Sequence, residues 1–296
     1  MTLLDRVRSR RFLHDALAVA GIIVVVFVWW LIGFNDYQHD ARAYWTVELS
    51  DPYAAAEVGG KDAYLYSPLF AQLTSPLTLL PWEVFRPLWA AVNLGALVWL
   101  AGPIIGALLL VVPGSPLIDE VGTGNIHLLI AAAIVAGFRY PPAWGFNLLT
   151  KVTPGIGLLY FVGARQWRHL ALAIGLTAAI SLVSFAVAPG LWLAWIEVLI
   201  TNTGARIPDD IAVIPGSLAL RTAIAGIIAI GGGILGWRWT AAVAATLALP
   251  VPWSSGLSVL VAVIALWRFD MLREPRRPFR THLRPSTPGQ REAQTA

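Results

Sequence analysis

Long apolar runs alternate with short polar turns along most of the chain. A transmembrane helix needs about 20 consecutive apolar residues, and the first run, at 15–33, meets this length. Runs at 84–101, 170–188 and 218–236 predict further spans. The pattern therefore predicts an all-α fold, a polytopic transmembrane helical bundle.

Shorter apolar runs, interrupted by Gly and Pro, lie between the long ones. We expect them to complete about ten membrane segments, some of them short re-entrant or interfacial helices. They occupy residues 69–80, 103–114, 125–138, 241–250 and 253–267. Polar stretches at 34–67, 115–124 and 189–217 predict loops on one side of the membrane.

Residues 142–163 allow two interpretations. A single span would place Arg139 and Arg165 on opposite sides of the membrane, whereas two half-helices meeting at 151–154 keep both arginines on the same side. We favour the half-helices, because discontinuous helices form binding sites in many membrane proteins.

The composition supports a membrane protein. The chain is 57% hydrophobic and 13% charged, against about 25% charged in soluble domains. Its net charge of +4 comes from Lys and Arg at the ends and in turns, which is typical of positively charged cytoplasmic loops. We therefore exclude nucleic acid as a partner and expect a multi-pass plasma-membrane protein with both termini in the cytoplasm.

The same composition predicts the domain organisation. Residues 1–274 are expected to form a single transmembrane domain. The basic, Pro-rich segment 275–296 is expected to be a disordered cytoplasmic tail.

Missing residues and motifs exclude several chemistries. The chain has no Cys, so it cannot form a disulfide, a thiolate nucleophile or a zinc–thiolate site. It also lacks the Walker, G-x-S-x-G, H-E-x-x-H and dinucleotide-binding motifs. We predict no metal ligands and no cofactor, and a metal requirement stays open.

The first polar loop, 34–67, carries the main candidate for catalysis, Asp40. A carboxylate near the membrane boundary is partly desolvated, which raises its pKa toward the range of a general base. Asp40 is then suited to take a proton from a sugar hydroxyl that attacks an activated anomeric carbon. The alternative is structural, with Asp40 capping a loop helix or pairing with Arg42.

Four other residues are candidates for binding a substrate. Lys151 lies within an apolar stretch, where a charge is costly; it can hold a lipid phosphate or extend to the lipid headgroups. Arg206, in the third polar stretch, offers a second phosphate ligand or only a surface charge. Asn125 and His127 start a span and can hydrogen-bond a sugar, although Asn125 equally suits a helix cap.

Several short segments carry a resemblance to a known family. They are Asp40 shortly before Tyr44, the Asp51-Pro52-Tyr53 turn, Tyr66-Ser67-Pro68-Leu69-Phe70, Gly124-Asn125-Ile126-His127-Leu128, Lys151-Val152-Thr153-Pro154, and Ser217-Leu218 followed by Arg221. Together they resemble glycosyltransferase family 87, integral-membrane enzymes of the C-type superfamily. That family includes actinobacterial mannosyltransferases that use polyprenyl-phosphate mannose. This chain departs from the family pattern with Ser67 in place of a proline and with Asn125 and His127 in place of Gln and Asn.

The resemblance implies an inverting hexosyltransferase of cell-envelope glycolipid or lipoglycan synthesis. A sugar, expected to be mannose, would pass from a polyprenyl-phosphate donor to a glycolipid or glycan acceptor on the extracytoplasmic side, giving an alpha linkage. Asp40 would be the general base. The residues that would contact the lipid-linked sugar are Tyr44, Tyr66, Asn125, His127 and Lys151.

Two other classes of protein stay open from the sequence. A transporter or flippase of lipid-linked sugars would share the apolar bundle and the buried lysine, but it would be expected to carry charges near the middle of several spans. A non-catalytic membrane scaffold would make the loop aspartates interchangeable surface charges.

Overall fold

The structure, a computed structural model, describes residues 3–35, 38–54, 56, 58, 60, 62–202 and 212–273. These residues form helices and no strand, as the sequence predicts. The α-helices are α1 (Leu3–Gly33), α2 (His39–Trp45), α3 (Pro68–Thr74), α4 (Trp82–Ala101), α5 (Pro103–Val111), α6 (Pro116–Thr123), α7 (His127–Gly137), α8 (Trp144–Thr150), α9 (Leu159–Gly163), α10 (Trp167–Val187), α11 (Pro189–Asn202), α12 (Leu218–Leu235), α13 (Trp239–Leu247) and α14 (Val261–Arg273). The 3-10 helices are η1 (Ser75–Leu79), η2 (Pro141–Ala143), η3 (Thr153–Leu158) and η4 (Ser254–Leu260).

The number of long apolar helices is smaller than expected. Within the described residues, 4 helices are long and apolar enough to cross a membrane, namely α1, α4, α10 and α12, or up to 5 if the bent pair of α5 and α6 is one span. About ten spans are not confirmed. Helix α7 has 11 residues and α13 has 9, so each extends roughly 15 Å, about half of the hydrocarbon core.

All three stretches expected to be loops contain a helix, and α2 lies within the first of them. Residues 115–124 contain α6, because Ser115 caps the helix by accepting a hydrogen bond from the Leu117 backbone and Pro116 occupies its first turn. The stretch 189–217 begins with the apolar helix α11.

The predicted break at 151–154 is present, between α8 and η3. The predicted tail at 275–296 lies outside the described residues.

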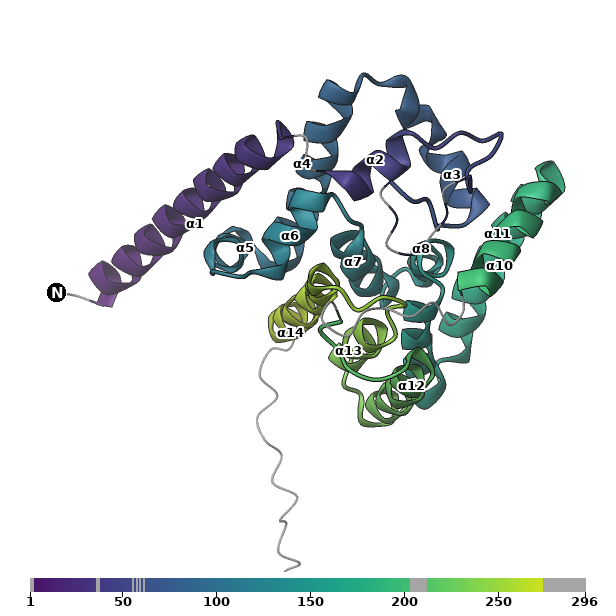
Figure 1. The fold of residues 1–296 in the computed structure, drawn as a ribbon. Helices are drawn as coiled ribbons and strands as arrows, with labels where there is room; N and C mark the ends of the chain where they lie inside the picture. Colours follow the sequence, from purple (N-terminus) through teal and green to yellow (C-terminus); the bar gives the residue numbers. More distant parts are fainter. Residues whose placement is uncertain are drawn as a thin grey trace, which may run out of the picture.

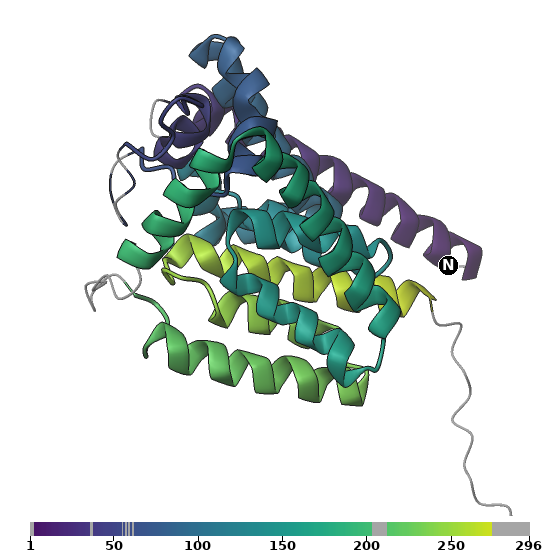
Figure 2. The ribbon, with the colours of Figure 1, turned by 90° about the vertical axis from the view of Figure 1, so that its right-hand side faces the viewer.

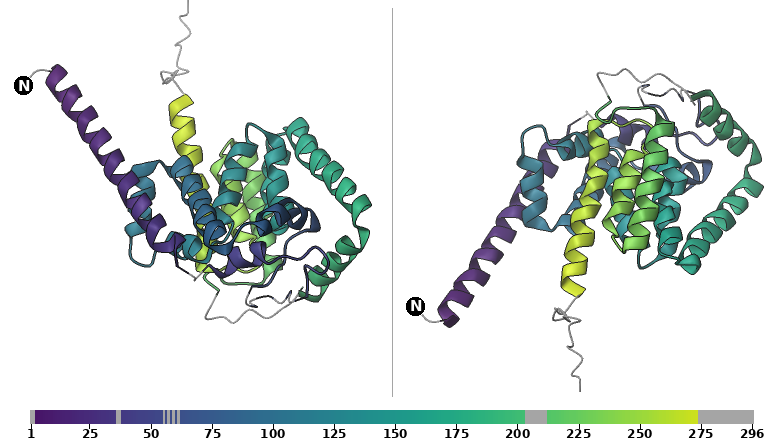
Figure 3. Two further views of the ribbon diagram at one scale, coloured as in Figure 1. Left: turned by 90° about the horizontal axis from the view of Figure 1, so that it is seen from above. Right: turned by 90° about the horizontal axis from the view of Figure 1, so that it is seen from below.

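Helices α12, α13 and α14 lie side by side along one face of the molecule, the lower one in Figure 1. Figure 3 shows α1 at one side of the molecule and the α10–α11 pair at the other, with α12, α13 and α14 between them. Helix α13 packs against both α12 and α14, and Figure 2 shows these helices one beside the next. Helices α2 and α3 lie near the N-terminal half of α4, above α7 in the view of Figure 1.

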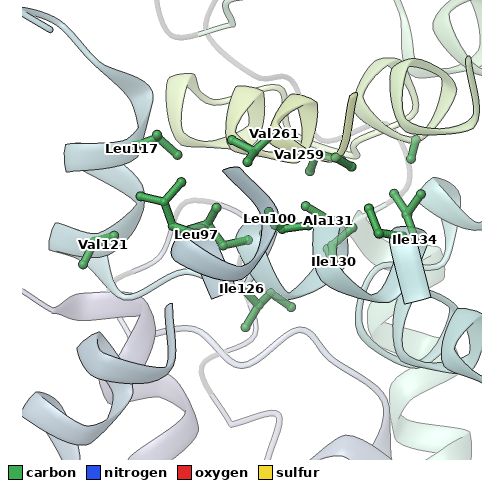
Figure 4. Packing of buried hydrophobic residues seen from close by; sticks show 14 of the residues in the cluster. Leu97, Leu100, Leu117, Val121, Ile126, Ile130, Ala131, Ile134, Val259 and Val261 are labelled. Atoms are coloured by element: carbon green, nitrogen blue, oxygen red, sulfur yellow. The ribbon is translucent and has the colours of Figure 1, made fainter. Parts of the chain in front are cut away.

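Helix α7 is the centre of the core. It contacts α4, α8, α13, α14 and η4 and is apolar on all sides, which is typical of a fully buried helix. Figure 4 shows its residues Ile130, Ala131 and Ile134 packed among Leu100 of α4 and Val259 of η4. The first residue of this buried helix is His127, so the core holds a polar side chain in a fixed place.

Candidate functional site

Helix α2 brings Asp40 to the start of α7 because the helix packs on Gly124. This glycine ends α6 with φ at 73°, and a Cβ at this position would lie 2.5 Å from the Cβ of Ala41. Trp89 of α4 holds the same turn, since its indole nitrogen donates to the Gly124 carbonyl at 2.6 Å. The missing side chain at 124 therefore allows α2 its close approach.

Asn125 links Asp40 to Lys151. The Asn125 side-chain nitrogen donates to Asp40 Oδ2 at 2.7 Å. Its oxygen accepts from the backbone N–H of Ile126 at 2.8 Å and from Lys151 Nζ at 3.5 Å. The amide orientation follows, because only the oxygen can accept from a backbone N–H. A carboxylate and an ammonium from distant parts of the chain thus share one amide.

His127 and Glu120 continue these contacts behind Lys151. The five residues Asp40, Asn125, Lys151, His127 and Glu120 are called the network below. Lys151 Nζ lies 2.6 Å from His127 Nε2, and the other ring nitrogen, Nδ1, lies 2.8 Å from Glu120 Oε2. The second carboxylate oxygen of Glu120 accepts from the Leu128 backbone N–H at 3.1 Å. Glu120 and His127 are completely buried, whereas Asp40 and Lys151 are half-buried. The network therefore runs from an accessible pair of charges into the closed interior.

The surroundings of Asp40 tune its acidity. Burial raises the pKa of the Asp40 carboxyl above its usual value; the nearby Lys151 charge opposes this rise, and the Glu120 carboxylate adds to it. The nearby Thr123 side chain also lowers the pKa of Asp40 and so favours its charged form. A carboxylate with a raised pKa is a stronger base than an exposed aspartate.

Buried tyrosines lie beside the carboxylate. The hydroxyls of Tyr44 and Tyr66 are 2.9 Å apart, and the Tyr44 ring packs against Trp89 with centroids separated by 5.1 Å. Tyr53 donates its hydroxyl to the Tyr66 carbonyl at 2.9 Å. Burial raises the pKa of both Tyr44 and Tyr66, so these phenols stay neutral and act as hydrogen-bonding groups. Their contact with a substrate stays a prediction.

The structure gathers most of the predicted site residues into one place. Those that lie together are Asp40, Tyr44, Tyr66, Asn125, His127 and Lys151. The alternative pairing of Asp40 with Arg42 is replaced by contact with Asn125, while Arg42 lies over the Trp82 ring at 5.2 Å. Arg206 lies outside the described residues.

Two residues of the family-like segments have structural contacts. The guanidinium of Arg221 donates to the carbonyls of Leu247 and Leu249, both at 2.8 Å, so it ties α12 to the turn after α13. The completely buried Ser67 caps α3 by accepting from the Phe70 backbone at 3.3 Å. The serine in place of a proline therefore has a local folding role.

Glu120 is the member of the network that the sequence analysis missed. It lies in a stretch that the sequence predicts to be a loop, where an acidic residue carries little information. Helical spacing would have found it, because Leu117, Glu120, Val121 and Gly124 share one buried face of α6. An acidic residue on an apolar helix face needs a partner, and His127 supplies one.

A surface cavity of about 630 Å³ lies on the other side of α6. It is lined by Asp119 and Gly122 of α6, by the turn before this helix and by Ile32 at the end of α1. None of the network residues lines it. Among the described residues, no three His, Asp or Glu side chains are arranged to hold a metal ion.

The fold and the site define a class of protein: a helical membrane protein that holds a desolvated carboxylate beside a lysine ammonium. The chain matches glycosyltransferase family 87 over residues 64–283, so it belongs to this family and is a glycosyltransferase. Of the candidate site residues that the structure describes, the matched region contains Tyr66, Asn125, His127 and Lys151 and begins after Asp40 and Tyr44. The chain matches none of the curated proteins or solved structures with which it was compared.

Proposed function

We propose that this glycosyltransferase moves a sugar from a polyprenyl-phosphate donor to a glycolipid or glycan acceptor, with inversion at the anomeric carbon. The proposed sugar is mannose, the product is alpha-linked, and the reaction takes place on the extracytoplasmic side of the plasma membrane. The observation that carries the proposal is the pairing of Asp40 and Lys151 through Asn125.

The Asp40–Lys151 pair matches the charges that develop on the attacking hydroxyl and the departing phosphate. Displacement at an anomeric carbon needs a base at the attacking hydroxyl and a cation at the departing phosphate. Asp40 supplies the base, and Lys151 supplies a cation that is half-buried, where an electrostatic contact is stronger than in water. A lipid-phosphate leaving group also explains why the chain needs no nucleotide-binding motif.

The proposed transfer forms one bond and breaks another. Asp40 removes the proton of the acceptor hydroxyl as its oxygen bonds to the anomeric carbon. The bond between that carbon and the phosphate oxygen breaks on the opposite face, and the electron pair leaves with the polyprenyl phosphate. Lys151 binds the departing phosphate oxygens. The proton on Asp40 then passes to water, which restores the carboxylate.

A transfer assay tests this function. Purified protein in detergent is given polyprenyl-phosphate mannose with a radiolabelled sugar, together with a membrane lipid extract. We expect the wild type to label a lipid or glycan and Asp40→Asn to lose transfer at least 100-fold, the lower end of what a positioned base contributes, about 10²- to 10⁴-fold. The asparagine keeps the shape and a hydrogen-bonding oxygen but cannot take the proton.

Asp51→Asn is the matched control. It removes an exposed carboxylate from the same loop and should transfer as the wild type does. Equal activity of Asp40→Asn and wild type would exclude Asp40 as the base. Transfer from polyprenyl-phosphate arabinose or glucose alone would correct the sugar, and no transfer from any of these donors would overturn the proposed donor class.

A further inference from the structure

The interior end of the network contains a carboxylate that the transfer reaction does not touch. Glu120 is completely buried, and burying a charged group is costly unless it is paired and hydrogen-bonded. Both of its oxygens are in use, one at His127 Nδ1 and one at the Leu128 backbone. A buried carboxylate with two directed contacts is held in one orientation.

The order of donors and acceptors determines where the protons lie. A lysine ammonium has only donors, so the 2.6 Å contact requires His127 Nε2 to be the acceptor. The ring proton then lies on Nδ1, where it can donate to the Glu120 carboxylate at 2.8 Å. A proton on Nε2 instead requires a neutral Lys151, and it also requires a protonated Glu120 if Nδ1 carries no proton.

We infer that Glu120 is a positioning residue that fixes His127 as the Nδ1–H tautomer, so that His127 Nε2 holds the Lys151 ammonium toward the departing phosphate. The role of Lys151 in this inference rests on the proposed function. His127 thereby orients the lysine, and with both ring nitrogens engaged it has no nitrogen left for a sugar. A carboxylate that fixes a histidine tautomer is an established way to orient a catalytic group.

The local fold supports this assignment. Gly124 turns the chain between α6 and α7 in the left-handed conformation, and the Glu120 carbonyl accepts from the backbone N–H groups of Gly124 and Asn125, both at 3.1 Å. The turn thereby fixes the backbone of Glu120 next to the first residue of α7, His127. The carboxylate and the imidazole meet because one short turn joins their helices.

The first test measures the tautomer and needs no substrate. The full-length protein in detergent is prepared with ¹⁵N in the histidine rings, and the signals of His127, one of 5 histidines, are identified by their absence in His127→Gln. An unprotonated ring nitrogen resonates far downfield of a protonated one, so the spectrum distinguishes the tautomers. We expect a protonated Nδ1 and an unprotonated Nε2. A protonated Nε2, alone or together with Nδ1, would overturn the inference even if transfer is confirmed.

The second test measures kinetics. Glu120→Gln should lower kcat about 10- to 100-fold, the range found when the carboxylate behind a metal-bound histidine is removed, and should change KM much less. The matched control is Asp119→Asn, the neighbouring carboxylate on the exposed face of α6, where an asparagine can keep the contact with Ser254. This variant should retain the wild-type kcat.

A double variant separates positioning from folding. If Glu120 acts through Lys151, adding Glu120→Gln to Lys151→Met should lower kcat no further. A full additional loss in the double variant, or a wild-type kcat in folded Glu120→Gln, would contradict the inference. If Glu120→Gln does not fold, the tautomer of the wild type still decides. An inactive wild type with the expected tautomer would reject the proposed donor and retain the role of Glu120 toward His127.

Discussion

Asp40 meets two opposing requirements. Burial raises its pKa and makes it a better base, but the same burial makes its charged form costly in the folded protein. Lys151 and Thr123 offset only part of this cost, since the pKa remains raised. The residue that carries the proposed reaction therefore weakens the fold at neutral pH.

The pH dependence of activity and stability follows from this shift. The base must be ionised, so kcat/KM should fall as pH decreases through a pKa above about 3.9, the usual aspartate value. Between that value and the higher folded pKa, the folded state binds more protons than the unfolded state, so stability falls as pH rises. Asp40→Asn removes this cost and should raise the melting temperature at pH 7.

Thermal melting in detergent as a function of pH checks this prediction. The increase in melting temperature of Asp40→Asn over the wild type should shrink on acidification. It should vanish below a pH of about 4, where Asp40 is neutral in both the folded and the unfolded wild type. The exposed Asp51→Asn should show no such trend. A gain that is independent of pH would mean that it does not arise from the Asp40 charge.

At the scale of single elements, α2 depends on the turn that ends α6. Gly124→Ala would add a Cβ that lies 2.5 Å from Ala41 and 3.2 Å from Trp89, at a φ of +73°. We expect α2 to shift, Asp40 to lose its contact with Asn125, and transfer to fall at least about 10-fold. The measurement is the rate of transfer divided by the amount of folded, monodisperse protein, which gel filtration determines.

Gly122→Ala is the control for that experiment. Gly122 lies in the same helix with open space where its Cβ would be, and alanine in a helix is favoured over glycine by roughly 0.5–1 kcal/mol. This variant should be as active as the wild type and slightly more stable. Equal transfer by both variants would show that the packing of α2 on Gly124 does not determine the position of Asp40.

Helices α12 and α13 are held together by Arg221. Lysine at this position keeps the charge but loses the planar group that reaches several carbonyls. Because a hydrogen bond to a charged group contributes about 1.5–3 kcal/mol, Arg221→Lys should lower stability by about 2 kcal/mol and leave the kcat/KM of folded protein unchanged. The exposed Arg139→Lys serves as control. A lower kcat/KM with unchanged melting would instead indicate a phosphate-binding role.

The sequence predicted the long elements and much of the site, and the reasons for its errors are physical. The spans at α4, α10 and α12 follow from hydrophobic length. The short helices α6 and α11 were missed because polar and Pro-rich flanks resemble loops, although Pro at the first turn also starts helices. Glu120 was missed because its role depends on His127, and no local pattern shows which side chains meet across a turn.

At the scale of the whole molecule, the proposed reaction requires one orientation in the membrane, with the first loop outside and the tail inside. The chain has no Cys, so single cysteines can be introduced without removing others. Ser50→Cys in the first loop should react with an impermeant maleimide in intact cells. Ser286→Cys in the tail should react only after lysis, because positively charged segments favour the cytoplasm.

The natural cysteine-free chain should remain unlabelled in both conditions. Labelling of Ser286→Cys but not Ser50→Cys in intact cells would invert the orientation and move the proposed reaction to the cytoplasmic side. Residue 286 lies outside the described residues, but the experiment needs only the side on which it is accessible.

The bridge through Asn125 also has a consequence for biosynthesis. Asp40 emerges from the ribosome early, while Asn125 and Lys151 follow only after α4, α5 and α6 have been made. An incomplete chain that stops before α8 therefore has Asp40 in its first loop but lacks both Lys151 and the contact that Asn125 makes between them. If Asp40 and Lys151 act as proposed, the reaction becomes possible only when more than half of the chain has been made, so translation itself delays the proposed chemistry until these helices have been made.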